Sequence, residues 1–219
     1  MITLTTYRWV PPFAQGLVRD MRVRWALEEA GLPYRTRLID LEQRDSPEHL
    51  ARQPFGQVPA YEDETVSLFE SGAIVLHIGA RSEVLLPMDP AARARSVTWL
   101  LAALNTMEPA IQTLAELDLF HAEEDWARQR RPAAEKAARR RLDQLAAWLG
   151  DQEYLENRFT LGDLMMACVL QILRGTDLVE EQPRLVAYLA RCEHRPAYRR
   201  ALKDHMAVFA ESEAAASAS

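Results

Sequence analysis

The stretch from Pro54 to Ile74, PFGQVPAYEDETVSLFESGAI, carries the most informative pattern in this chain of 219 residues. Val58–Glu62 and Thr65–Phe69 are short apolar runs on either side of an acidic turn, which indicates a β-hairpin. Glu70-Ser71-Gly72 then opens an apolar helix, and we expect Ser71 to be its N-cap. The stretch therefore predicts two strands followed by a helix.

The residues before this stretch predict a strand, a helix and a second strand. Ile2–Tyr7 is rich in β-branched residues, as strands are, and is followed by a loop over Arg8–Gly16 that contains two prolines. From Val18 the apolar residues follow helical spacing until Gly31, a typical helix end. Arg35–Leu41 then predicts a strand parallel to the first, because the helix serves as the crossover. The first third of the chain is thus βαβ-ββα.

Beyond Leu86–Pro90, where two prolines mark a linker, the chain has mainly helical periodicity. The predicted helices cover Ala91–Ala115, Pro132–Gly150, Leu161–Leu173, Pro183–Arg191 and Pro196–Ala210. We therefore expect an α/β domain over residues 1–84, a linker over 85–90 and an all-helical domain over 91–219.

Composition excludes several classes of function. The chain has 26 Lys+Arg against 32 Asp+Glu, a net charge of −6, which argues against nucleic acid as a partner. Its apolar runs fall short of the roughly 20 residues that a bilayer requires, and its start does not resemble a secretory signal. Cys168 and Cys192 are unpaired by spacing, which favours a reducing, cytoplasmic location. The histidines show no metal-ligand spacing, so we expect no metal.

Pro54–Ala60 together with Phe69–Ile74 resembles the glutathione-site signature of the cytosolic glutathione S-transferase family, in a form similar to bacterial members. The order of the predicted elements resembles the thioredoxin-like domain of that family. Three later segments resemble its helical domain: Trp99–Ile111, Phe159–Asp163 and Arg191–Ala197. The resemblance spans nearly the whole chain and implies a thioredoxin-like domain followed by an all-α domain.

The resemblance also implies a site for glutathione as co-substrate. In this family the proline that matches Pro59 follows a cis peptide bond, which would present the backbone of Val58 to an extended peptide as a neighbouring strand would. Ser71, at a helix N-terminus, would bind the γ-glutamyl carboxylate. Glu70 would face the ammonium group of the ligand, and Gln57 would add an amide.

A further part of the site is the group that activates the sulfur of glutathione. A free thiol has a pKa of about 8.5, and the thiolate is the nucleophile, so the protein must favour the thiolate. In this family the donor is a Tyr at the end of the first strand, or a Ser or Cys before the first helix. Residues 8–22 contain no Ser, Thr, Cys or Tyr, so Tyr7 is the expected catalytic residue. The fallback donors are Thr5, Thr6, Gln15, Arg19 and Arg22.

Tyr7 has an alternative interpretation as a packing residue. The loop after it is longer than is usual in the family, and strand side chains alternate between faces, so its ring can instead pack at the edge of the sheet.

The expected activity is transfer of glutathione to a small, mostly apolar electrophile bound between the domains. The expected walls of that second pocket are Trp9, Phe13, Met107 and Ile111. A homodimer is expected, with Arg93–Leu104 in its interface. Two alternatives stay open: a non-catalytic binding or assembly module, and another glutathione-dependent enzyme, such as a dehalogenase, isomerase, ether-cleaving enzyme or peroxidase.

Thr160 and Asp163 form a capping pattern ahead of an apolar helix. We expect these two residues to fix the start of that helix and to have no part in chemistry.

Overall fold

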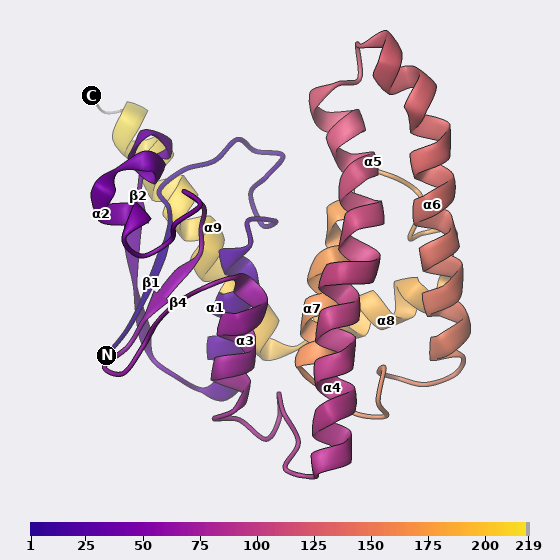
Figure 1. Ribbon diagram of the computed structural model, residues 1–219, viewed down its shortest axis with the longest axis horizontal. Helices are drawn as coiled ribbons and strands as arrows, with labels where there is room; N and C mark the ends of the chain where they lie inside the picture. The colour runs from indigo at the N-terminus through magenta and orange to yellow at the C-terminus, as the bar shows by residue number, and fades with distance from the viewer. Residues whose placement is uncertain (218–219) are drawn as a thin grey trace. The chain divides into compact units, whose positions relative to one another are not determined.

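The computed structural model describes the backbone of residues 1–217 and the side chains of residues 1–214. The chain divides into two compact units (Figure 1). The first unit combines Met1–Leu86 with the segment that begins at Arg195, and the second is Pro87–His194.

The first unit contains a mixed four-stranded sheet with strand order β2-β1-β3-β4. Its strands are β1 (Ile2–Tyr7), β2 (Tyr34–Ile39), β3 (Ala60–Glu62) and β4 (Ser67–Phe69). β1 runs parallel to β2 and antiparallel to β3, and β4 is antiparallel to β3. This topology confirms the predicted βαβ-ββα order.

The strands of the hairpin are shorter than predicted. β3 begins after Pro59, which has no N–H to donate to a ladder. In the turn, the Asp63 carboxylate accepts hydrogen bonds from the backbone N–H groups of Thr65 and Val66, at 2.8 and 3.0 Å. These two residues therefore belong to the turn, and β4 begins at Ser67.

The helices of the first unit pack on the sheet or on one another. They are α1 (Asp20–Ala30), the short 3₁₀ helix η1 (Leu41–Asp45), α2 (Pro47–Leu50), α3 (Ser71–Gly79) and α9 (Pro196–Ser217). α1 ends, as predicted, at Gly31, whose φ is +65°. On the sheet, Tyr61 lies opposite Leu4, and the Tyr61 ring contacts the His77 ring of α3 at 5.5 Å. The sheet face that carries Leu4 and Tyr61 is therefore the face under α3.

The second unit is entirely helical, as predicted. Its elements are α4 (Pro90–Ala102), the π-helical turn η2 (Ala103–Met107), α5 (Glu108–Phe120), α6 (Asp125–Leu149), α7 (Leu161–Leu170), η3 (Gln171–Leu173) and α8 (Pro183–Glu193). The predicted helix over Ala91–Ala115 is interrupted by η2, just before Pro109. Within the described part of the chain, every helix is too short or too polar to span a bilayer.

α7 is the buried centre of the second unit, and all ten of its residues are buried. Gly162 lets it approach α4 closely, because a Cβ added there would lie 2.6 Å from the Cβ of Trp99. The capping box of Thr160 and Asp163 is present at its start, which confirms the predicted structural role.

The boundary expected for the helical domain differs from the observed grouping at its C-terminal end. α9 belongs with the first unit and packs along α1. Arg195, at the start of this segment, forms a two-pronged ion pair with Glu29, and Arg200 pairs with Glu28. Ion pairs between distant residues and packing on α1 therefore hold α9 in the first unit. Local helical periodicity does not reveal such contacts.

Candidate functional site

One edge of the sheet gathers the residues that the sequence singled out. The paired residues Thr5, Ala60 and Phe69 lie side by side on β1, β3 and β4. Just beyond this row, β1 ends at Tyr7, the cis Val58–Pro59 bond precedes β3, and Ser71 begins α3 after β4. Three chain segments with different roles in the fold therefore converge at this edge.

The loop before β3 is held in shape by side chains. The Val58–Pro59 peptide bond is cis, and Val58 lies beyond the ends of both ladders of β3. The buried His49 ring contacts the Gln57 carbonyl oxygen at 2.8 Å through Nε2, which donates because a carbonyl only accepts. The Gln53 side-chain oxygen accepts the N–H groups of Phe55 and Gln57, at 2.7 and 3.2 Å. The backbone at Val58 is therefore fixed in advance of any ligand.

The turn into α3 is conformationally unusual. Glu70 has φ +66° and ψ 114°, a region that residues with a side chain rarely adopt. Glu70 occupies the N-cap position and is exposed, whereas Ser71 is the first helical residue. The prediction of Ser71 as N-cap is therefore wrong by one residue, because the strained backbone at Glu70 moves the helix start. The N–H of Ser71 remains among the unpaired first N–H groups of the helix.

Arg22 approaches Ser71 from α1. Its Nη1 donates to the Ser71 hydroxyl oxygen at 3.2 Å, and both residues are buried, at 3% and 4% exposed. A serine hydroxyl has two acceptor positions and one hydrogen to donate. With an acceptor position filled by Arg22, the Ser71 O–H is left to donate, next to a positive charge. This arrangement favours a negatively charged oxygen as its partner.

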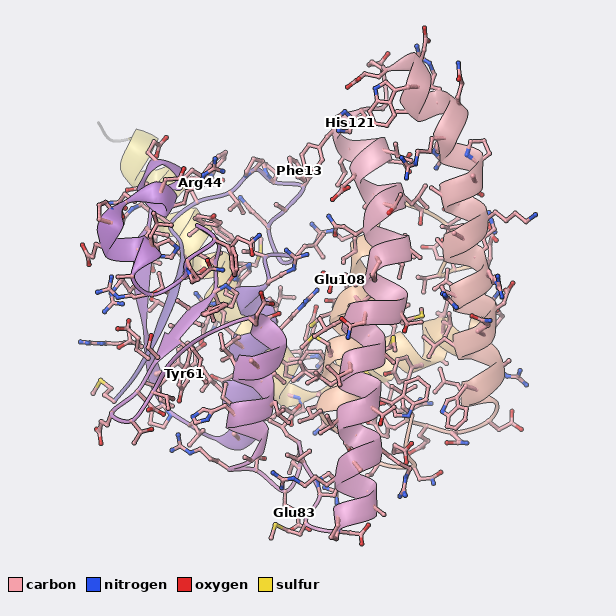
Figure 2. The ribbon with its side chains drawn as sticks, in the orientation of Figure 1. Phe13, Arg44, Tyr61, Glu83, Glu108 and His121 are labelled. Atoms are coloured by element: carbon pink, nitrogen blue, oxygen red, sulfur yellow. The ribbon has the colours of Figure 1, made fainter. Side chains whose placement is uncertain are left out.

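Tyr7 lies on the opposite face of the sheet from Arg22. It shares its face with Thr3 and Thr5, because side chains alternate along a strand, whereas Leu4 faces α3. Its surroundings include Arg44 and Asp45 of η1 (Arg44 is labelled in Figure 2), and burial raises the pKa of the Tyr7 hydroxyl. The edge thus offers two different donors, one on each face.

The loop between β1 and α1 contains the other predicted residues of the first unit. The Gln15 amide donates to the Val10 carbonyl at 3.2 Å, and Arg19 is exposed at the start of α1. The side chains of Trp9 and Phe13, the latter labelled in Figure 2, are 39% and 44% exposed. Thr5 and Thr6, the remaining fallback donors, are buried at 0% and 1% exposed.

In the second unit, Met107 ends η2 and Ile111 follows on α5. They are 5% and 0% exposed, so both side chains are buried. Among residues 1–217, no three His, Cys, Asp or Glu side chains gather in a way that could hold a metal ion. Cys168 and Cys192 are buried and form no disulfide within the described part of the chain, as expected from their spacing.

The sequence did not indicate two residues that support the site, His49 and Gln53. Both act through contacts with a loop two to eight residues away, and a buried polar residue of this kind has no periodic signature. Arg22 was named only as a possible sulfur donor, and its contact with Ser71 spans 49 residues of sequence.

Comparison with known proteins identifies both units. A family model described as glutathione S-transferase, N-terminal domain, matches residues 3–80, and one described as glutathione S-transferase, C-terminal domain, matches residues 109–196. A glutathione S-transferase from Silene vulgaris is 31% identical over 198 residues, which covers 83% of this chain and 90% of the relative. One from Hyoscyamus muticus is 29% identical over 195 residues, 84% of this chain and 92% of the relative.

Solved structures agree with these matches. A glutathione transferase family member from Pseudomonas fluorescens, crystallised with two glutathione molecules bound, superimposes with a TM-score of 0.81 at 25% identity, over 92% of each chain. Glutathione transferase F7 from Populus trichocarpa, at 24% identity and a TM-score of 0.78 over 94% of this chain and 99% of the other, shares the fold.

Proposed function

Because the chain belongs to the glutathione S-transferase family, we propose that it binds glutathione at the sheet edge described above and transfers it to a small electrophile. The observation that carries this proposal is the convergence of the Val58 backbone and the Arg22–Ser71 pair at one edge. Backbone groups beside a cis proline suit an extended peptide, and a hydroxyl at a helix N-terminus suits a carboxylate.

In this proposal, each group at the edge has a separate role. Val58 pairs with the peptide backbone of glutathione, and the Ser71 hydroxyl and N–H donate to its γ-glutamyl carboxylate. The exposed Glu70 carboxylate faces the ammonium group, and Gln57, also exposed, adds an amide. His49, Gln53 and Arg22 hold these groups in place.

The reaction that we propose is nucleophilic attack by the bound thiolate. The thiol loses its proton to solvent, the sulfur forms a bond to the electrophilic carbon, and the leaving group departs with the electron pair of the broken bond. The protein contributes by lowering the pKa of the thiol, which a donor hydrogen bond to the sulfur achieves. Trp9 and Phe13, with exposed rings, are proposed to contact the apolar electrophile.

Tyr7 is our first proposal for the sulfur donor, since it ends β1 at the same edge as Val58. Replacing Tyr7 by Phe is expected to lower the conjugation rate with a chromogenic aryl halide by roughly 10–100-fold, because one donor to a developing charge is lost. The ultraviolet absorbance of bound thiolate, titrated with pH, is expected to show the thiol pKa well below about 8.5 in the unmodified protein and higher in the variant.

Tyr34→Phe serves as the matched control, because Tyr34 begins the neighbouring strand at the other end of the sheet. If the thiol pKa were unchanged in Tyr7→Phe, the hydrogen-bond donor to the sulfur would have to lie on the face of the sheet that carries Arg22. An unshifted pKa in the unmodified protein would instead support a non-catalytic binding module.

Ser71→Ala is expected to weaken glutathione binding by about 1–2 kcal/mol, or roughly 5–30-fold in Kd, because the variant removes one hydrogen-bond donor to a carboxylate. Isothermal titration calorimetry measures this directly. Ser67→Ala, an exposed position on β4, is the control and is expected to leave the affinity unchanged. Equal affinities for the two variants would contradict the assigned carboxylate site.

A two-fold dimer completes the proposal, as the commonest closed assembly of soluble proteins. α4 offers Leu101, which is 48% exposed, as an apolar contact within the segment Arg93–Leu104.

A further inference from the structure

The end of α9 is hydrogen-bonded to the loop between β1 and α1. The Ser212 hydroxyl lies 3.0 Å from the Arg8 carbonyl and 2.9 Å from the Val208 carbonyl of its own helix, so its one hydrogen is shared between the two acceptors. The Glu213 carboxylate oxygen Oε1 accepts the indole N–H of Trp9 at 3.0 Å and the amide of Gln15 at 3.3 Å. These bonds join residues about 200 positions apart in the sequence, from 198 for Gln15 to 204 for Trp9.

The loop is also shaped by short turns and by its attachment to the sheet. Residues 8–19 form turns and bends and no regular helix or strand, with backbone bonds such as that from Leu17 to the Ala14 carbonyl and a side-chain bond from Gln15 to the Val10 carbonyl. At its start, the Arg8 N–H donates to the Ile39 carbonyl of β2. Ordering a segment of this length has a large cost in conformational entropy, so each bond to a distant residue reduces the number of conformations that the loop adopts. Glu213 bonds Trp9 near the start of the loop and Gln15 six positions further on, through a single oxygen atom.

α9 is a firm anchor for these contacts. Its neighbour Arg195 pairs with Glu29, Arg200 pairs with Glu28, and His205 contacts the Asp20 carboxylate at 3.2 Å. The helix is therefore fixed along the length of α1, and Figure 1 shows the two helices side by side. Its last turns reach the loop from this fixed base.

In the sequence, the loop connects two parts of the proposed site. It starts directly after Tyr7 at the end of β1 and leads into α1, where Arg22 donates to Ser71. It also carries Trp9 and Phe13, whose rings are partly exposed. Val58 and Ser71, which would bind glutathione, lie outside the loop.

We propose that Ser212 and Glu213 are positioning residues that hold the 8–19 loop in the conformation that receives the electrophile. The inference rests on the proposed function for its effect on activity, but the contact between α9 and the loop does not. Loss of the Glu213 contacts frees the loop, so that Trp9 and Phe13 no longer present a fixed surface. The electrophile then binds less well, while glutathione binding is retained.

Glu213→Gln tests the proposal, because the amide keeps the size of the side chain and removes its charge. We expect hydrogen exchange in residues 8–19 to accelerate by about 3- to 10-fold, since hydrogen bonds to charged groups are the stronger ones. We expect KM for an aryl halide to rise by a similar factor, while kcat at saturating electrophile and Kd for glutathione change less than about twofold.

Glu211→Gln is the matched control, an exposed acid two residues away on the same helix with no hydrogen bond to the loop among the described residues. Combining Glu213→Gln with Trp9→Phe is expected to accelerate hydrogen exchange by less than the product of the two single effects, because the first change weakens the bond that the second removes. Unchanged exchange in Glu213→Gln overturns the proposal whatever the activity. Faster exchange in a protein whose glutathione thiol pKa is unshifted overturns the proposed function and leaves the loop contact standing.

Discussion

Replacement of Asp20 by alanine is expected to lower the free energy of unfolding by about 3–5 kcal/mol, the usual result of removing one partner from a buried ion pair. The Asp20 carboxylate is fully buried and accepts hydrogen bonds from Arg24 Nε at 2.7 Å and His205 Nδ1 at 3.2 Å. Burial raises the pKa of Asp20, but the charges and hydrogen bonds of His205 and Arg24 outweigh burial and hold it well below its usual range. Without the carboxylate, the buried Arg24 guanidinium loses its counter-charge.

The cluster has no reserve of hydrogen bonds to compensate. Four buried atoms, three in the cluster and one on the neighbouring Tyr34, make no hydrogen bond to any described residue: Asp20 Oδ1, Arg24 Nη2, His205 Nε2 and Tyr34 Oη. The expected loss is a large part of the 5–15 kcal/mol that stabilises an ordinary domain. Urea denaturation followed by circular dichroism measures it, with Asp204→Ala as control, an exposed acid next to His205 on α9. Equal midpoints for the two variants would show that the cluster contributes no net stability.

Asp163→Asn is expected to destabilise the second unit strongly and in a pH-dependent way. The Asp163 carboxylate accepts the N–H groups of Leu155 and Thr160, both at 2.9 Å, and the Tyr188 hydroxyl at 3.1 Å. An amide in its place offers one acceptor oxygen instead of two, so buried donors are left unpaired at a cost of about 1–3 kcal/mol each.

The pH dependence follows from the direction of the pKa shift. Burial raises the pKa of Asp163 to about 6, although its hydrogen bonds act in the opposite direction. In the unfolded chain the value is about 4, so between these two pH values the folded state binds more protons than the unfolded state. The stability contributed by Asp163 is therefore fully present below about pH 4 and is lost as the pH rises through about 6.

The difference in unfolding free energy between the wild type and Asp163→Asn is thus expected to be largest near pH 4 and smaller near pH 7. Urea titrations of both proteins at several pH values measure it, and the subtraction cancels the histidines common to both. A difference that grows with pH would mean that the hydrogen bonds outweigh burial, so that the folded state favours the ionised carboxylate.

Features with a local origin could be predicted from the sequence. The capping box at Thr160 and Asp163, the end of α1 at Gly31 and the strand–helix order of the first 86 residues each depend on neighbours within a few positions. Features that depend on distant partners could not. The contact of Asp20 with His205 spans 185 residues, and each residue alone looks like an ordinary helix position.

The candidate site shows the same division. Val58, Pro59 and Ser71 were identifiable because they lie in one short stretch with a known resemblance. The exact helix start was not, since it depends on the positive φ of Glu70. The face of Tyr7 also required the register of three strands, because a shift of one residue would exchange the two faces of the sheet.

The return of α9 to the first unit has a consequence for biosynthesis. Trp25 of α1 is fully buried and its ring contacts Tyr198 of α9 at 4.8 Å, so this side of α1 lacks its cover until α9 has been made. At about 5–20 residues per second, a ribosome needs on the order of 10 s for the stretch between Leu86 and Pro196. Throughout that interval the nascent first unit exposes an apolar surface on α1, and its Asp20–Arg24 ion pair lacks the contact with His205. The second unit can fold as soon as its own residues emerge, so the unit that begins first is completed last.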